Sequence, residues 1–276
     1  MAISINTNMA SIMAYKGLQS TSNALGKSMQ RLASGLKINT ARDDAAGLAI
    51  ATRMQAQIRG LNAVQQNAND GASLSDVAYS ALTETDNALQ SIREIAVEAR
   101  NATLSSSDRT ALQLTVSELV SEVQRIATGT AFNKINLLTG SFANKSFQVG
   151  ANAGDTVKFT INTASLEGLG MGAAGVNADV TTAALASTTI TTIDTAISSV
   201  SAIRAQLSGM QSRFESVLST AIATADAYTA SRSSIMDADV ALESANMTKY
   251  SILQQAGISV LAQANQQPSM LLKLLE

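Results

Sequence analysis

Proline is almost absent from this chain, and this absence constrains its fold more than any other feature. The 276 residues contain one proline, Pro268, close to the C-terminal end. A proline inside a helix removes one backbone hydrogen bond and collides with the preceding turn, so it kinks or ends the helix. Because no such ring precedes Pro268, long uninterrupted helices are possible along nearly the whole chain.

Apolar residues at the N-terminal end recur at steps of three, four and seven, the spacing of one stripe on an amphipathic helix. The stripe predicts a helix over 5–34 and consists of Ile5, Met9, Ile12, Leu18, Leu25, Met29 and Leu32. Gly35 follows as a break, and Thr40 and Asp43 then have the spacing of a capping box. In that motif a hydroxyl and a carboxylate bond the free N–H groups of a first turn, so a second helix should begin there.

Counting this second helix, three helices are expected after the first on the same grounds, over about 43–100, 105–128 and 190–230. The second of these keeps alternating steps of four and three from Leu112 to Ile126. The third holds one seven-residue frame from Ile190 to Tyr228. A heptad frame of that length requires partner helices along it.

Residues 132–162 change to a period of two, which indicates strands. The alternating residues are Phe147, Val149, Val157, Phe159 and Ile161, with turn residues from Gly150 to Asp155 between them. We expect a β-hairpin here, and an exposed variable loop over 163–188, where Gly, Ala, Thr and Ser dominate.

The last helical stretch, from Val240 to Gln266, resembles the first in carrying a thin apolar stripe. Such a helix gains most of its stability from packing and is marginal alone in water. We therefore expect a mainly α fold in which the N- and C-terminal segments pair as a long coiled-coil-like bundle and then associate with other copies. The residues expected to carry this association are Ile5, Met9, Ile12, Leu25, Met29, Leu32, Ile252, Leu253, Ala256, Val260 and Leu271.

Several classes of function are disfavoured by composition. The chain has no Cys, His or Trp, so it has no thiolate nucleophile, no imidazole base and no Cys/His zinc site. We expect a protein that is not an enzyme and assign no catalytic, metal or cofactor-binding residue. A net charge of −2 and 3% aromatic residues disfavour nucleic-acid binding, and no apolar run approaches the roughly 20 residues that span a bilayer.

Two patterns in the sequence resemble ligand-binding or catalytic sites, but simpler explanations account for both. Gly170, Gly172 and Gly175 spell GxGxxG, but no amphipathic helix follows to complete a dinucleotide-binding unit. Acidic groups occur at Asp43–Asp44 and at 237–243, where helix N-termini and a solvated or interfacial face account for them.

Five segments of the sequence resemble bacterial flagellins. The longest is LASGLKINTARDDAAGLAIATRMQAQIRGL at 32–61. The others are INTNMASIMAYKGLQ near the start, NANDGASLSDVAYSAL at 67–82, FNKINLLTG at 132–140 and ILQQAGISVLAQANQQPSMLLKLL at 252–275. The resemblance implies that 1–42 with 235–276 form an inner-tube domain of paired terminal helices, and that 43–234 form an outer-core domain. The chain lacks the large domains that bigger flagellins insert at its middle, so it resembles a minimal member.

The resemblance also implies function and partners. It implies a subunit that self-assembles into an extracellular flagellar filament for swimming, with a cap protein, a hook–filament junction protein, an export chaperone and a type III export apparatus as partners. That export route would account for an N-terminal segment that does not resemble a signal peptide. The segment 89–101 resembles the helix that engages Toll-like receptor 5, with Arg93, Glu94 and Ile95 matching and Ser91 where activating members usually carry Arg. Packing on a helix surface explains Ile95 equally well.

Two other functions remain open. A hook–filament junction protein shares the terminal helices but sits in few copies, and the strength of the matches at 32–61 and 252–275 favours the filament subunit. An adhesive surface protein would need an elaborated exposed domain.

Overall fold

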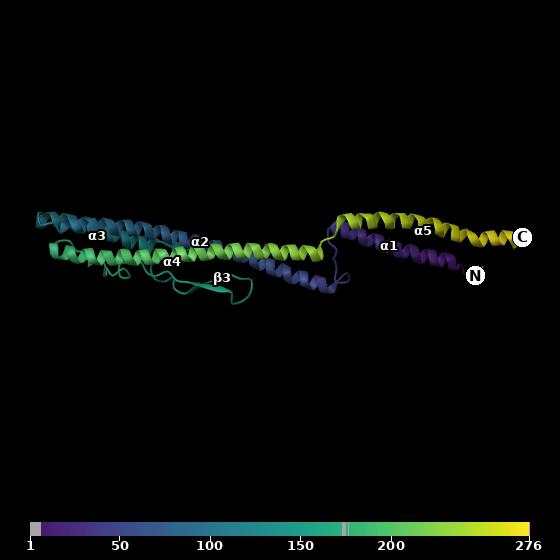
Figure 1. Ribbon diagram of the computed structural model, residues 1–276, viewed down its shortest axis with the longest axis horizontal. Coiled ribbons are helices and arrows are strands. Elements are labelled where there is room, and N and C mark those ends of the chain that lie inside the picture. The colour runs from purple at the N-terminus through teal and green to yellow at the C-terminus, as the bar shows by residue number, and fades with distance from the viewer. Residues whose placement is uncertain (1–6, 173–174, 176, 276) are drawn as a thin grey trace. The chain divides into compact units, whose positions relative to one another are not determined.

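The computed structural model describes residues 7–172, 175 and 177–275, with side chains as far as Gln267. Helices dominate these residues (Figure 1) and are α1 (Met9–Ser34), α2 (Ala45–Ala99), α3 (Ser106–Gly129), α4 (Ala183–Met236) and α5 (Val240–Leu275). Short strands between α3 and α4 are β1 (Ala131–Phe132), β2 (Ile135–Asn136), β3 (Lys145–Gln148) and β4 (Thr156–Phe159). The mainly α fold with a small β region in the middle of the chain is confirmed.

The chain divides into two compact units. Met1–Ala56 with Ala227–Glu276 make up the terminal unit, and Gln57–Asp226 make up the central unit. The predicted domains, with bounds at residues 42 and 235, are an inner and an outer layer of a filament. These layers stay a prediction.

The core of the central unit lies between α2 and α4. Buried residues of α2 follow one another at steps of three and four, as a helix does when it packs along a partner; they include Leu61, Val64, Ala68, Leu82, Leu89, Ile92, Ala96 and Ala99. Those of α4 include Ile193, Val200, Leu207, Phe214 and Ala221, at intervals of seven. The heptad frame seen in the sequence is therefore the buried face of α4.

Four phenylalanines close one side of this core. Phe147 on β3 and Phe159 on β4 meet Phe142 and Phe214 with ring centroids 5.3–6.5 Å apart. The strands β3 and β4 pair antiparallel, with Phe147 opposite Val157, as the predicted hairpin requires. Gly71 on α2 makes room for Phe214, because a Cβ there would lie 2.6 Å from the ring.

The segment expected as an exposed loop over 163–188 is not one, and that prediction is wrong. Its first part holds buried side chains, including Ala164, Leu166, Leu169, Met171, Ala178 and Val180, and α4 has already begun at Ala183. Two glutamines of α3 satisfy the backbone of this segment. Gln113 accepts from Val180 N at 2.7 Å and donates to Ala178 O, and Gln124 accepts from Leu166 N. The composition of the segment predicted exposure because it contains no sign of these hydrogen bonds, which come from α3.

The starts of α1 and α2 differ from expectation. Helix α1 begins at Met9, where the side chain of Asn8 accepts from Ser11 N at 3.1 Å. Helix α2 begins at Ala45 and is capped by Asp44, which accepts from the N–H groups of Ala46 and Gly47. Asp43 instead bonds Thr40 N and Oγ1 within the preceding turn, so Thr40 and Asp43 are not the helix cap.

Helix α5 does not end before Pro268 but continues to Leu275. A proline removes one N–H from the ladder of a helix, which weakens it locally without having to end it.

Candidate functional site

The two ends of the chain pair with each other in the terminal unit, where α1 and α5 lie side by side (Figure 1). They run antiparallel, since Asn8 at the start of α1 donates to Ala264 O at 2.7 Å while Arg31 near its end contacts Glu243 at the start of α5. The expected pairing of terminal helices is therefore present within one subunit.

The faces that meet are poor in large apolar side chains. On α1 the residues withdrawn from water include a set at steps of three and four: Ser11, Ala14, Leu18, Thr21, Leu25, Ser28 and Leu32. On α5 they include Met247, Tyr250, Gln254, Gly257, Leu261 and Ala264. Leu18 lies over Gly257, where an added Cβ would be 3.3 Å from Leu18 Cδ1. This contact buries few methyl groups for its length, so it stabilises the pair only modestly.

A partly buried ion pair lies in the same contact. Arg31 Nη1 donates to Glu243 Oε1 at 2.8 Å. The guanidinium of Arg31 holds the pKa of Glu243 below its ordinary value, and Ser28 and Asn246 act in the same direction. Glu243 belongs to the acidic group at 237–243, for which the sequence predicted a solvated or interfacial face. The prediction of a solvated face is wrong for Glu243, because this residue is 6% exposed and its carboxylate forms an ion pair with Arg31.

The segment that follows α1 and the segment that precedes α5 are hydrogen-bonded to each other. Lys37 N donates to Met236 O and Ala238 N donates to Gly35 O, which forms an antiparallel bridge between Leu36 and Asp237. Lys27 Nζ lies 2.7 Å from Asp43 Oδ1, and this contact holds the pKa of Asp43 well below its usual range. Asp239 accepts from the N–H groups of Ala241 and Leu242 and so caps α5.

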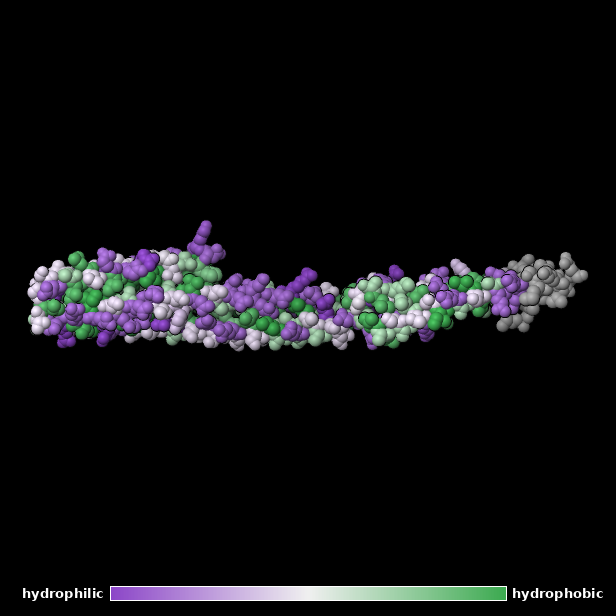
Figure 2. Space-filling model, turned by 90° about the horizontal axis from the view of Figure 1, so that it is seen from above, coloured by the Kyte–Doolittle hydropathy of each residue, from purple (hydrophilic) through white to green (hydrophobic). Residues whose placement is uncertain are grey.

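Large apolar side chains of the terminal helices point to solvent. Eleven of the nineteen exposed large apolar side chains among the described residues lie on α1 and α5. We call these the terminal apolar surface: Met9, Ile12, Met13, Tyr15, Met29, Val240, Leu242, Ile252, Leu253, Ile258 and Val260. In Figure 2 hydrophobic side chains reach the surface of this unit among hydrophilic ones. Large exposed apolar patches are typical of surfaces that bind another molecule.

The predicted association residues fall into two groups. Leu25 and Leu32 are half-buried against α5, whereas Met9, Ile12 and Met29 are exposed, as are Ile252, Leu253, Ala256 and Val260 on α5. Ile5 lies outside the described residues, and so does the side chain of Leu271. The single stripe expected on α1 is thus divided between a face turned to α5 and a face turned to solvent.

Several members of the terminal apolar surface were not predicted. Met13 lies four residues from Met9, and Leu242 shares one flank of α5 with the predicted Leu253 and Val260. A search for a second apolar stripe beside the first would have found them, because 242, 253 and 260 are separated by eleven and seven residues, which are whole numbers of helical turns to within a fraction. No sequence pattern linked Arg31 to Glu243.

The segment 89–101 lies on α2 in the central unit. Arg93 and Glu94 are exposed, and Ile95 is half-buried against the core. Arg93 Nε donates to Asp194 Oδ1 on α4 at 2.6 Å, and this contact raises the pKa of Arg93.

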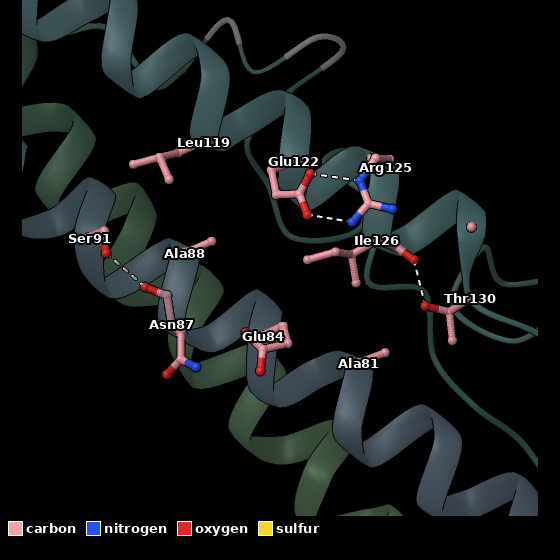
Figure 3. A pocket seen from close by; sticks show the side chains of 11 residues that line it. Ala81, Glu84, Asn87, Ala88, Ser91, Leu119, Glu122, Arg125, Ile126 and Thr130 are labelled. Carbon is pink, nitrogen blue, oxygen red and sulfur yellow. Dashed lines mark hydrogen bonds and ion pairs between the residues drawn. The ribbon is translucent and has the colours of Figure 1, made fainter.

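A groove of about 530 Å³ separates α2 from α3 in the same unit. Figure 3 shows Glu84, Asn87 and Ser91 on one wall, and on the other the side chains of Glu122 and Arg125, which pair with each other. The groove is shallow, and Arg125, the one basic group in its lining, is already paired with Glu122, so it has no evident catalytic geometry.

Other candidate chemistry is equally sparse in the part of the chain that is described. Its Asp and Glu residues form no group of three that could hold a metal ion. Gly170, Gly172 and Gly175 all have positive φ, so a tight turn accounts for the GxGxxG pattern. None of the described helices has both the length and the apolarity needed to cross a bilayer.

Comparison with known proteins matches both ends of the chain to one family. The model of the bacterial flagellin N-terminal helical region matches residues 5–143, and that of the C-terminal helical region matches residues 190–275. The flagellar filament 33 kDa core protein of Treponema phagedenis is 38% identical over 283 residues, covering 98% of this chain and 99% of that one. A flagellin of Halalkalibacterium halodurans is 38% identical over 271 residues, with the same coverage. The crystal structure of Bacillus cereus flagellin superposes with a TM-score of 0.51 at 27% identity, over 56% of this chain and 88% of that one.

Proposed function

This chain belongs to the bacterial flagellin family and is a structural subunit of the extracellular flagellar filament, and we propose that its subunits associate through the terminal apolar surface of α1 and α5. The observation that carries the proposal is the exposure of Ile252, Leu253 and Val260 on a helix whose other face is already paired with α1. The family is one of structural proteins, and the proposed role requires no chemical step.

The energetics favour association over an isolated helix pair. Full burial of one large aliphatic side chain contributes about 1.5–3 kcal/mol. The α1–α5 contact is built largely from small and polar residues such as Ala14, Thr21 and Gln254, so it leaves most of the available hydrophobic stabilisation unused. A second copy that covers the terminal apolar surface would recover it.

The test places charges on this surface in the full-length chain. We expect the double variant L253D/V260D to remain unassembled when seeded with filament fragments, because burying an unpaired carboxylate costs several kcal/mol. Electron microscopy and sedimentation measure assembly, and circular dichroism checks that helical content is retained.

The matched control is L185D at the start of α4, since Leu185 is 41% exposed and Leu253 is 45% exposed. The control should form filaments at the wild-type concentration. Filaments of normal length from L253D/V260D would refute association through this surface.

The assignment of layers and partners is part of the same proposal. Residues 1–42 with 235–276 would line an inner tube, and 43–234 would form an outer core. A cap protein, a hook–filament junction protein, an export chaperone and a type III export apparatus that needs no cleaved signal peptide would serve its assembly. Seeded growth of long filaments distinguishes this role from that of a junction protein, which would stay in small complexes.

Recognition by Toll-like receptor 5 through Arg93, Glu94 and Ile95 is a separate proposal. The exposure of Arg93 and Glu94 on α2 supports it. Monomeric wild-type chain and the variant R93A/E94A would be compared for receptor binding. Equal binding by both would exclude this segment as the receptor-binding site. Arg93 and Glu94 would then be ordinary residues of a solvated helix surface.

A further inference from the structure

The side chains of this protein that two-electron oxidants attack most readily are its methionines. The chain contains ten Met and no Cys, Trp or His. A thioether is converted to a sulfoxide by mild hydroperoxides, and the reaction is faster where the sulfur is exposed. Oxidative chemistry on this protein is therefore directed by where its methionines lie.

The exposed methionines are concentrated on one helix. Met9, Met13 and Met29 are 56%, 65% and 52% exposed, and all three belong to α1. Met171 and Met236 are buried, and Met54, Met210 and Met247 are half-buried. Among the methionines whose side chains are described, those open to solvent thus all lie on the terminal apolar surface.

Pairing of α1 with α5 does not protect them. Residues four apart on a helix share a face, so Met9 and Met13 lie together, and this face is largely opposite to Leu18 and Leu25, which are turned to α5. Met29 follows the buried Ser28 in sequence but is itself more than half exposed. An unassembled subunit therefore presents all three methionine residues to solvent.

We propose that Met9, Met13 and Met29 are oxidation-sensitive modification sites on α1, at which a hydroperoxide produces methionine sulfoxides that prevent subunit association. The inference rests on the proposed role of the terminal apolar surface in assembly. It adds a chemical state of the free subunit that controls whether this surface can be covered.

The chemical step needs only the hydroperoxide. A lone pair on the thioether sulfur attacks the terminal peroxide oxygen, the O–O bond breaks, and an S–O bond forms. With hydrogen peroxide as oxidant, the oxygen that leaves takes up a proton and departs as water. The sulfur loses two electrons and the peroxide gains them, so the step is balanced.

The product changes the surface from apolar to polar. A sulfoxide oxygen is a strong acceptor, and burying it without a donor is unfavourable. We expect the free subunit concentration that coexists with filaments to rise about tenfold or more, the factor that corresponds to one poorly paired polar group.

The experiment uses full-length subunits treated briefly with dilute hydrogen peroxide and then quenched with free methionine. Peptide mass spectrometry locates the sulfoxides, and sedimentation after seeding gives the soluble subunit concentration. We expect sulfoxide first at Met9, Met13 and Met29, together with the tenfold rise. Treatment with methionine sulfoxide reductases should reverse both.

Two variants make the result specific. M9L/M13L/M29L replaces the thioethers by apolar side chains that do not oxidise and favour the helix, so its assembly should be insensitive to peroxide. M54L/M210L/M247L should remain as sensitive as the wild type. Unchanged assembly of subunits fully oxidised at Met9 and Met13, or equal loss in M9L/M13L/M29L, would overturn the inference alone. Failure of untreated subunits to assemble would overturn the proposed function and this inference with it.

Discussion

Arg31 on α1 and Glu243 on α5 form an ion pair with 2.8 Å between Nη1 and Oε1, although 212 residues separate them in sequence. The side chain of Glu243 is only 8% exposed. A matched polar pair inside an otherwise weak helix contact penalises shifted alignments, in which one charge would be buried alone. We infer that this pair fixes the register of the two ends of the chain.

Replacing Arg31 by methionine should loosen the terminal unit. R31M leaves the carboxylate of Glu243 without its cationic partner, and we expect α1–α5 pairing to lose about 2 kcal/mol. Hydrogen exchange of α1 amides in the full-length chain measures this loss. The double variant R31M/E243M should recover most of it, since no lone charge remains, and equal instability of the single and double variants would contradict the register role.

Acid should weaken the same pairing. Arg31 lowers the pKa of Glu243 from its ordinary value of 4.5, so folding favours the carboxylate. Its stabilisation is complete above the unfolded-state pKa and is lost as pH falls through the lower, folded-state pKa. Protection factors of α1 amides, which correct exchange rates for their intrinsic dependence on pH, should therefore fall below about pH 4.5.

The variant E243Q should show less of this acid dependence. Part should persist, because the pKa of Asp43 is also lowered, chiefly by Lys27. An unaltered pH profile for E243Q would show that Glu243 does not contribute to it.

Gly71 and Gly209 should respond in opposite ways to alanine. In α2 a Cβ at Gly71 would meet three atoms of the Phe214 ring at 2.6–2.9 Å. We expect G71A to lose about 1–3 kcal/mol through overpacking. At Gly209, an exposed position in α4, a Cβ meets nothing within 4 Å, so G209A should gain about 0.5–1 kcal/mol of stability. Thermal unfolding of the full-length chain compares the two, and a stabilised G71A would mean that Phe214 can move aside.

Two ion pairs between α2 and α4 should differ in their contributions. Arg204 lies 3.3 Å from Asp86 Oδ2, donates to Tyr79 Oη and stacks 4.8 Å from the Tyr79 ring centre. We expect R204M to lose about 1–2 kcal/mol, because Asp86 is left half-buried with fewer donors. Arg93 and Asp194 are about half exposed, at 47% and 49%, so R93A should be close to neutral. Denaturant unfolding measures both, and equal losses would show that burial does not separate them.

The periodicity of the central helices could be predicted from the sequence because it is local. Ile193, Val200, Leu207 and Phe214 recur every seven residues and so lie on one face of α4. Any partner that packs along α4 must cover that face. The hairpin was equally accessible, since Phe147 and Val157 alternate with polar residues on either side of a turn. Helix starts were less so, because Thr40, Asp43 and Asp44 all have capping chemistry and only one can occupy the cap.

The segment before α4 shows where local reasoning fails. Its Gly, Ala and Thr residues predict exposure, yet Leu169, Met171 and Val180 are buried. Gln113 and Gln124 of α3 bond three of its backbone groups, at Leu166, Ala178 and Val180. Nothing within the segment specifies those donors and acceptors.

By itself the sequence determined that the chain is mainly helical, that both ends carry apolar stripes, and that these ends resemble those of flagellins. Only the tertiary structure decided how each stripe is used: Leu18 and Leu25 turn to α5, while Met9, Met13 and Val260 remain exposed. The physical reason is that a helical period fixes which residues share a face but not which face a partner covers. That choice depends on long-range contacts such as Leu18 over Gly257 and Arg31 with Glu243, which no local pattern encodes.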